Sequence, residues 1–168
     1  MLCVTRGDIF SSGAEALVNP VNCVGVSGRG LAAAFKQRYP ENFAIYKEAC
    51  DRGTLRPGGL VMTNLARESG DDGPRFIVNL PTKDHWRSSS RLSYIEEGLE
   101  SLVAVIMIHG IRSVALPALG CGLGKLSWDD VHELMMQAFE PLPDVEVTVF
   151  EPLGSAVGMT AGDGEEWL

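Results

Sequence analysis

Three features are missing from this 168-residue chain: a Cys-x-x-Cys pair, any lysine or arginine between residues 140 and 168, and an apolar run of about 18 residues. The four cysteines, at positions 3, 23, 50 and 121, and the three scattered histidines lack the spacing of a zinc site, so we expect no structural metal. The chain also has no charged-then-apolar leader. We therefore expect a cytoplasmic protein with reduced thiols and no membrane partner.

Positive charge is scarce as well, because 14 lysines and arginines face 22 acids and the formal net charge is −8. This balance excludes a protein that binds bulk nucleic acid over its whole surface, since phosphate contacts need lysine and arginine. The exception is residues 75–91, where a single acid, Asp84, accompanies four cations: Arg75, Lys83, Arg87 and Arg91. An anionic ligand near this stretch remains compatible with the sequence.

The hydrophobic content of 45% in 168 residues suits one compact domain. Apolar runs of strand length alternate with stretches whose apolar residues recur every three or four positions. Strands are predicted at residues 1–7, 15–22, 58–65, 74–81, 113–119 and 145–150, and helices at residues 31–38, 40–53, 91–109 and 127–139. This order predicts an α/β fold, a three-layer α/β/α sandwich with a mixed central sheet and a ligand site in the loops at the strand ends.

Some local details also follow from the pattern. The runs at residues 58–65 and 74–81 are continuously apolar, which is typical of strands buried on both faces. The segment between them reads as a hairpin loop. Capping is predicted at three helix ends, by a capping box of Ser93 with Glu96, by Gly110 as a C-cap, and by Ser127 with Asp130.

Two glycine-rich loops each follow a predicted strand and precede a predicted helix. They read NCVGVSGRGL at residues 22–31 and ALGCGLGKL at residues 118–126. Such loops form cradles of main-chain N–H groups for phosphates, although neither has the spacing of a Walker or Rossmann motif. A single loop is equally well explained by relief of backbone strain. Two on one sheet favour a ligand that carries a diphosphate.

At these residues the sequence resembles the macro domain, an ADP-ribose-binding module. The shared motifs are RGDI at residues 6–9, ALVNPVN at 16–22, GVSGRGLA at 25–32 and GCGLG at 120–124. The resemblance covers residues 1–153 and implies ADP-ribose as the ligand, with no cofactor. Residues 154–168 are left as an acidic, glycine-rich tail that is either disordered or a linker to a further domain.

The resemblance implies a role for each motif. Asp8 and Ile9 would contact adenine, with the Asp8 carboxylate accepting from the exocyclic amine. Asn22 would lie near the distal ribose; its alternative role is to cap its own loop. The two glycine loops would enclose the distal ribose and the diphosphate through Gly25, Val26, Ser27, Gly28, Gly30 and Leu31 on one side and Leu119, Gly120, Cys121, Gly122 and Leu123 on the other. For Cys121 and Cys23 we expect a backbone role rather than a nucleophilic one.

Within macro domains, residues 79–102 resemble the branch of DarG-type antitoxins and terminal ADP-ribose protein glycohydrolases, which carry a lysine at the position of Lys83. The stretch His85-Trp86-Arg87 is closer to the DarG side. The protein glycohydrolases place an aspartate in the second glycine loop where this chain has Gly124. Leu123 departs from the polar residue that we expect in DarG-type loops.

The resemblance implies that Lys83 is catalytic, attacking C1 of the distal ribose or its ring-opened form, because an amine forms adducts with anomeric carbons that water later resolves. The amine must first lose its proton, and the positive charge of Arg87 would favour that loss. The alternative is a solvated loop lysine. Thr82, His85, Trp86 and Arg87 would hold the attached nucleotide, with Trp86 as a stacking platform rather than a lid.

Three functions follow in order of preference. The first is a glycohydrolase that removes ADP-ribose from thymine bases of single-stranded DNA, as the antitoxin partner of a DarT-type toxin. The second is a hydrolase of ADP-ribosyl-glutamate on proteins, which Gly124 and the DHWR stretch disfavour. The third is a reader that binds ADP-ribose without cleaving it, which has no need of an amine at Lys83.

Overall fold

The computed structural model of the chain describes residues 1–68 and 70–152. Six strands form one sheet in the order β1-β6-β5-β2-β4-β3. Neighbouring strands are parallel except for β3, which runs antiparallel to β4, so the predicted mixed sheet and the hairpin are confirmed. The bounds are β1 Leu2–Thr5, β2 Ala16–Val21, β3 Val61–Asn64, β4 Phe76–Pro81, β5 Ser113–Pro117 and β6 Glu146–Phe150.

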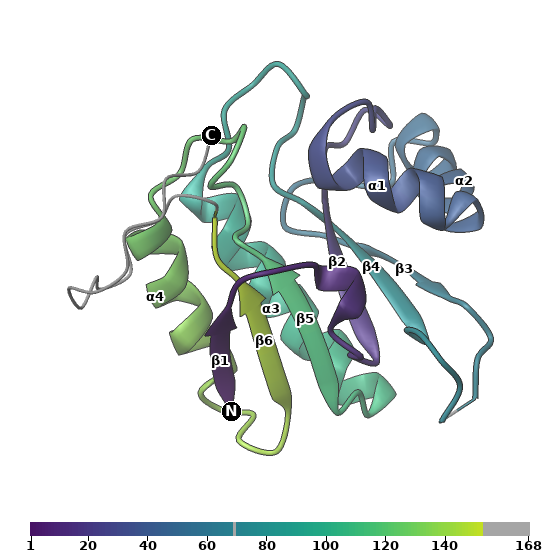
Figure 1. The fold of residues 1–168 in the computed structure, drawn as a ribbon. Coiled ribbons are helices and arrows are strands. Elements are labelled where there is room, and N and C mark those ends of the chain that lie inside the picture. The colour runs from purple at the N-terminus through teal and green to yellow at the C-terminus, as the bar shows by residue number, and fades with distance from the viewer. Residues whose placement is uncertain (69, 153–168) are drawn as a thin grey trace, which may run out of the picture.

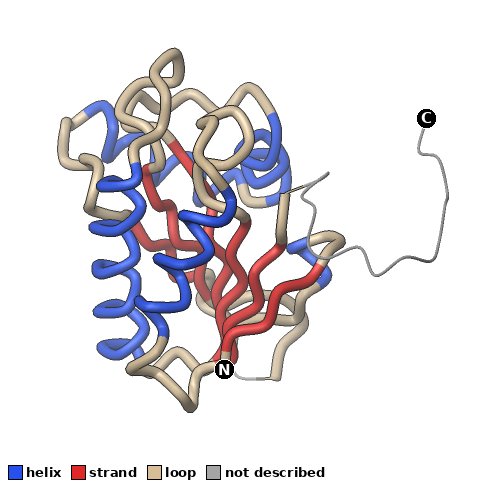
Figure 2. Tube along the Cα trace, turned by 90° about the vertical axis from the view of Figure 1, so that its left-hand side faces the viewer, coloured by secondary structure: helices blue, strands red, loops and turns tan. Residues whose placement is uncertain are grey.

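Helices cover both faces of this sheet, as Figures 1 and 2 show. Helices α3 (Leu92–His109) and α4 (Trp128–Phe139) lie on one face, while α1 (Gly30–Arg38), α2 (Pro40–Asp51) and the short 3-10 helix η1 (Ile9–Ser11) lie on the other. The alternation of side chains along a strand explains the two cores. In β2, Val18 packs in the cluster with α3 and α4, and its neighbour Leu17 packs in the cluster with η1 and α1. The predicted three-layer sandwich is confirmed.

A close approach between α3 and β4 depends on Gly98. A Cβ atom at this position would lie 2.9 Å from Cδ2 of Leu80, so any larger residue would push the helix away from the strand. Both Leu80 and Gly98 are buried. The glycine therefore fixes the distance between β4 and α3, and with it the loop at residues 82–91 that joins them.

The prediction that residues 58–65 form a strand buried on both faces is wrong. Only Thr63 of β3 is buried, whereas all six residues of β4 are. The reason is position, because β3 is the edge strand of the sheet and has a strand neighbour on one side only. Its apolar residues are half-buried: Val61 packs against the cluster that contains Tyr46 of α2, and Met62 packs against the cluster with α3.

Two of the three predicted helix caps are corrected. Helix α3 has Arg91 as its N-cap, in extended conformation, which places Ser93 inside the first turn and rules out the Ser93–Glu96 capping box. Ser127 is the N-cap of α4, but its side chain makes no capping hydrogen bond. Gly110 is confirmed as the C-cap of α3, with a left-handed backbone at φ 62°.

The five mutually parallel strands all point their carboxyl ends to the same edge of the sheet (Figure 1). Proline lies at or next to the end of three neighbouring inner strands, as Pro20 in β2, Pro81 in β4 and Pro117 in β5, where it removes an N–H from the ladder. The chain therefore leaves the sheet at this edge in loops. The predicted tail at residues 154–168 lies outside the described residues. Among the helices that the structure describes, none has the length and apolarity to cross a bilayer.

Candidate functional site

A cavity of about 1130 Å³ opens at the carboxyl edge of the sheet. Its wall contains residues that follow each of the five parallel strands, as expected for a ligand site in an α/β fold. Most of the predicted site residues line it: Asp8, Ile9, Asn22, Val26, Gly28, Gly30, Leu31, Thr82, Lys83, Trp86, Arg87, Gly120, Cys121, Gly122 and Leu123. Four motifs far apart in sequence therefore meet in one place.

Four predicted residues do not line the cavity: Gly25, Ser27, His85 and Leu119. Leu119 is fully buried in the core beneath α3 and α4, so its side chain is not available to a ligand. Gly25 is turned toward α2, where a Cβ would lie 3.5 Å from side-chain atoms of Lys47 and Cys50. Gly25 and Leu119 therefore shape their loops, whereas His85 lies next to the lining residue Trp86.

Asn22 organises the first glycine loop. Its Oδ1 accepts hydrogen bonds from the N–H groups of Val24, Gly25 and Val26 at 3.0, 3.1 and 3.3 Å, and its Nδ2 donates to the Val26 carbonyl at 2.8 Å. The hydroxyl of Tyr46 lies 2.7 Å from the Asn22 carbonyl and 3.0 Å from Oδ1. The amides of residues 24–26 are thus used inside the loop. On this side of the cavity, the N–H groups that suit an anion are those of residues 28–32, at the amino end of α1.

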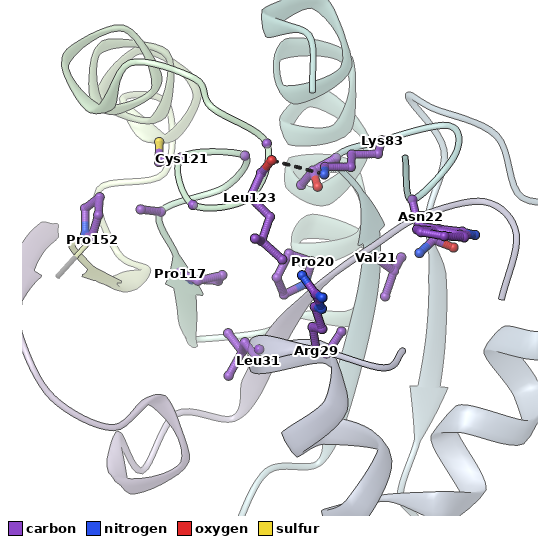
Figure 3. Close-up of a pocket in the computed structure, with 18 of the residues that line it drawn as sticks. Pro20, Val21, Asn22, Arg29, Leu31, Lys83, Pro117, Cys121, Leu123 and Pro152 are labelled. Carbon is purple, nitrogen blue, oxygen red and sulfur yellow. Dashed lines mark hydrogen bonds between the residues drawn. The ribbon is translucent and has the colours of Figure 1, made fainter. Parts of the chain in front are cut away.

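Lys83 lies between the two glycine loops. Its Nζ donates a hydrogen bond of 3.2 Å to the main-chain oxygen of Leu123 in the second loop, drawn as a dashed line in Figure 3. On the other side, the N–H of Thr82 donates to the main-chain oxygen of Val21 at 2.9 Å. The N–H of Cys23 donates to the main-chain oxygen of Asp84 at 3.0 Å. The loop at residues 82–91 is therefore attached to both glycine loops. The lysine is held at the cavity wall rather than free in solvent.

The second glycine loop is packed against Ser90. The Ser90 N–H donates to the Gly124 carbonyl at 3.2 Å, and a Cβ atom on Gly124 would lie 2.2 Å from Ser90 Oγ and 2.5 Å from the Gly120 oxygen. Gly120 has a positive φ of 74°. Glycine is thus required at position 124 by close packing, and at position 120 by the backbone conformation as well.

Next to Lys83, three side chains form an aromatic and cationic cluster. The rings of His85 and Trp86 stack with centroids 5.5 Å apart, and the Arg87 guanidinium lies 4.6 Å from the centroid of the Trp86 ring. His85 Nδ1 accepts a hydrogen bond from the Arg87 N–H at 3.1 Å, which tightens the turn. Trp86 keeps 44% of its surface exposed. The cluster offers an amphipathic surface at one end of the cavity.

The other end of the cavity is formed by the loops after β1 and β6. Asp8 lines it and caps η1, since its Oδ1 accepts from the Phe10 N–H at 2.9 Å. Beside it lie Phe150, Glu151 and Pro152, which sequence reasoning missed. The signal for them was present, because Phe150 ends the last parallel strand, β6, and Glu151 and Pro152 follow it. The Glu151 carboxylate accepts from Nε of Arg6.

Other lining residues, which were not among the predicted site residues, come from the same loops and from the strand and helix ends next to them. They are Gly7, Pro20, Val21, Arg29, Ala32, Ser88, Ser89, Pro117, Ala118, Gly124 and Lys125. Figure 3 shows Arg29 and Leu31 on the opposite side of the cavity from Leu123 and Cys121. Two of these residues, Arg29 and Lys125, are cations. They add to Lys83 and Arg87, the two cations among the predicted site residues.

The two cysteines near the site are poor nucleophiles. Burial raises the pKa of the Cys121 thiol from 9.0 to about 11. Burial, with the nearby Asp84 carboxylate and Cys50 in support, raises the pKa of Cys23 from 9.0 to about 12. Both thiols are therefore protonated at neutral pH. Among the described residues no group of three or more histidine, cysteine, aspartate or glutamate side chains is placed to hold a metal ion.

The structure has a cavity at the carboxyl edge of a three-layer α/β/α sandwich, and a family model for the macro domain matches residues 18–135. The chain belongs to the macro domain family. Among solved structures it is similar to the macrodomain of Mycobacterium tuberculosis DarG, with 46% identity and a TM-score of 0.87 over 90% of this chain and 98% of that one. The macrodomain of Thermus aquaticus DarG gives 45% identity and a TM-score of 0.85 over 90% of this chain and 99% of that one.

The chain is also similar to part of two longer proteins. The chain is 45% identical over all of its 168 residues to a DNA ADP-ribosyl glycohydrolase of Mycobacterium tuberculosis, and covers 46% of that protein. It thus spans just under half the length of this curated relative. The structure of Thermosipho africanus DarTG in complex with ADP-ribose matches at 33% identity and a TM-score of 0.85, over 94% of this chain and 43% of that one. The family expected from the motifs is confirmed.

Proposed function

We propose that this macro domain binds ADP-ribose and removes it from thymine bases in single-stranded DNA. The observation that carries the proposal is the position of Lys83, held at the cavity wall between the two glycine loops. Relatives of similar sequence are DNA ADP-ribosyl glycohydrolases, and one solved relative is in complex with ADP-ribose. Because the proposed substrate is DNA, the proposal includes a cytoplasmic location.

In the proposed binding mode ADP-ribose extends along the cavity from the loop after β1 to Lys83. The adenine lies at the end formed by Asp8, where the carboxylate accepts from the exocyclic amine. The diphosphate lies against the amino end of α1 and the second glycine loop, where main-chain N–H groups and the helix dipole favour negative charge. The distal ribose then reaches Lys83, and the attached base reaches the surface of Trp86. The volume of about 1130 Å³ exceeds that of common small-ligand sites, which are roughly 300–1000 Å³, so space remains for the base.

In the proposed reaction the Lys83 amine, once it has lost its proton and left the Leu123 oxygen, attacks C1 of the distal ribose or of its ring-opened form. A carbon–nitrogen bond to lysine forms, and the bond from C1 to the thymine nitrogen breaks. The base leaves with the bonding electron pair and takes up a proton. Water then hydrolyses the lysyl adduct, which releases ADP-ribose and restores the amine.

The biological role that we propose is that of an antitoxin to a DarT-type toxin, since removal of ADP-ribose restores the modified base. Support comes from a relative in Thermosipho africanus, 34% identical over 164 residues, which is a DNA ADP-ribosyl transferase-DNA ADP-ribosyl glycohydrolase fusion protein. This chain covers 42% of that fusion, so contacts with a toxin belong to the proposal.

The second candidate, hydrolysis of ADP-ribosyl-glutamate on proteins, is disfavoured by the packing of Gly124. A side chain there would meet Ser90 and the Gly120 oxygen, so the second loop cannot carry a carboxylate at that position in this conformation. The third candidate, a reader without activity, does not account for a lysine that is placed at the wall.

The deciding experiment incubates the protein in parallel with a single-stranded oligonucleotide that carries ADP-ribosylated thymidine and with a protein that carries ADP-ribosyl-glutamate. Release of ADP-ribose is measured by mass spectrometry, and binding of free ADP-ribose by calorimetry. We expect release from the oligonucleotide only. Release from the protein alone would support the second candidate, and binding without release from either substrate would support the reader.

A further inference from the structure

The wall of the cavity holds a group of residues that the proposed reaction does not use: Lys125, Ser88 and Ser89. We propose that these three side chains bind a backbone phosphate of the nucleic-acid strand next to the modified base. The inference rests on the proposed function, because it concerns the part of the substrate that lies outside ADP-ribose.

The three residues come together through Ser90 and Gly124. The hydrogen bond from the Ser90 N–H to the Gly124 carbonyl, 3.2 Å long, joins the loop at residues 82–91 to the second glycine loop. Ser90 itself is 6% exposed and packs on Gly124. Ser89 and Lys125 are the chain neighbours of this bonded pair, and both are exposed and line the cavity, as does Ser88. An ammonium group and two hydroxyls are therefore placed on one part of the rim.

The backbone at Lys125 is unusual. Its φ is 64°, and Ala66 is the other non-glycine residue of the described chain with a positive φ. The surrounding loop imposes this conformation, because the Lys125 N–H donates to the Gly122 carbonyl and the Leu126 N–H to the Gly120 carbonyl, at 3.1 and 2.9 Å. Glycine adopts such a conformation without strain, so the turn gives no reason for a long cationic side chain. A ligand contact would give one.

The charge of the cavity wall points to more than one phosphate group. Six charged residues line the cavity, two acids, Asp8 and Glu151, and four cations, Arg29, Lys83, Arg87 and Lys125. The four salt bridges found among the described residues involve other cations, so none of these four is neutralised by a carboxylate there. The net charge of the whole chain is −8, so this is a local reversal of sign. Glu151 is paired with Arg6, and Lys83 must be neutral to react, so Arg29, Arg87 and Lys125 remain as cations for the two charges of the diphosphate and for one further phosphate.

Phosphodiester oxygens of a DNA strand suit this set of donors. Lysine ammonium and serine hydroxyl groups are common contacts to the nucleic-acid backbone, where they position the strand without reading its sequence. Ser88 and Ser89 follow directly after Trp86 and Arg87, so a base that stacks on Trp86 has its own backbone near the two serines. A phosphate at Lys125 would hold the strand in that register.

The test compares Lys125→Gln, Lys125→Gly and the wild type on two substrates, an ADP-ribosylated single-stranded oligonucleotide and ADP-ribosylated thymidine, which lacks a phosphodiester. We expect both variants to raise KM for the oligonucleotide several-fold with little change in kcat, and to act normally on the nucleoside. The slope of log KM against log salt should fall by about 0.7, the value for one lost contact to a single strand. Lys125→Arg should restore the wild-type behaviour.

Arg112→Gln is the matched control, since it removes the same charge from an exposed residue at the amino edge of the sheet, before β5. Lys125→Gly also separates binding from folding, because it should lose affinity for the oligonucleotide while its melting temperature is unchanged or higher. An equal loss on the nucleoside would overturn the inference and assign Lys125 to the ADP-ribose diphosphate. Unchanged kinetics on both substrates would also overturn it.

A binding measurement keeps this inference distinct from the proposed function. Fluorescence anisotropy with an unmodified single-stranded oligonucleotide requires no turnover. If the wild type cleaves neither substrate, the proposed function fails, and the strand subsite is still decided by this measurement. Weaker binding by Lys125→Gln than by Arg112→Gln supports the subsite, and equal binding by the two variants rejects it.

Discussion

Lys83 Nζ lies 3.2 Å from the main-chain oxygen of Leu123, so the proposed catalytic amine touches the loop that closes the other side of the ligand site. The bond crosses between two segments that are 40 residues apart in sequence. Lys83 is half-buried and this hydrogen bond is exposed, so the amine is accessible from the cavity. Because the acceptor is a main-chain oxygen, the contact is independent of the side chain at position 123.

If Lys83 is the nucleophile, Lys83→Ala and Lys83→Met should both lower turnover of ADP-ribosylated DNA, by on the order of 10³-fold or more. Binding of free ADP-ribose should change much less, because the amine contributes to the reaction more than to the ground state. Single-turnover assays and calorimetry on the same samples measure the two effects. A Lys83→Ala protein with wild-type turnover would remove this residue from the mechanism.

The sequence predicted the layers, the mixed sheet and about half of the residues in the cavity wall. In a parallel sheet the residues after each strand meet at one edge, which predicts a ligand site there, and the resemblance to the macro domain named Asp8, Asn22 and Lys83 as its residues. What it did not predict depends on contacts made in space. The edge position of β3 and the start of α3 at Arg91 rather than Ser93 are set by neighbours in the fold.

The roles of single loop residues were harder still to predict. Asn22 looks like a ligand contact in the sequence, yet its amide groups are bonded within its own loop. Leu119 belongs to a loop motif and is completely buried. A motif shows which residues recur in a loop, but it does not show which of their groups face the ligand and which hold the loop in shape.

Gly124→Ala should destabilise the protein by roughly 1–3 kcal/mol, the usual cost of overpacking, because its Cβ would meet Ser90 and the Gly120 oxygen. Gly122→Ala is the matched control in the same loop, since no atom lies within 4 Å of its added Cβ. Urea unfolding followed by circular dichroism measures both. Adding Ser90→Gly to Gly124→Ala should recover part of the loss. Equal stability of the two single variants would show that the second loop adapts freely.

Asn22→Ala should weaken ADP-ribose binding by loosening the first glycine loop. The substitution removes the acceptor of three main-chain N–H groups and leaves the Tyr46 hydroxyl with the Asn22 carbonyl alone. Loss of hydrogen bonds to buried groups costs about 1–3 kcal/mol. Hydrogen exchange should show faster exchange of the amides of residues 24–26, and calorimetry a weaker affinity. Slow exchange at these amides in the variant would mean that the loop holds its shape without the Asn22 side chain.

Trp86→Ala should raise KM for the modified oligonucleotide more than it changes ADP-ribose binding, if the exposed indole supports the attached base. Stacking of a base on an aromatic side chain contributes about 1–3 kcal/mol, which corresponds to roughly 5- to 150-fold in affinity. Trp86→Phe keeps an aromatic face and should retain most of the effect. Unchanged KM in Trp86→Ala would favour a lid or a purely structural role for the His85–Trp86–Arg87 cluster.

Stability should fall as the pH rises above 9. Burial raises the pKa of Cys23 from 9.0 to about 12, and that of Cys121 from 9.0 to about 11. Between these values the unfolded chain loses thiol protons that the folded chain keeps, so alkaline pH favours unfolding, whereas below pH 9 both states keep them. Chemical denaturation at pH 7, 9 and 10.5 measures the decline. The Cys23→Ala variant should decline less steeply than the wild type. An identical decline in both proteins would assign the pH effect to other groups, such as Tyr46, whose pKa burial also raises.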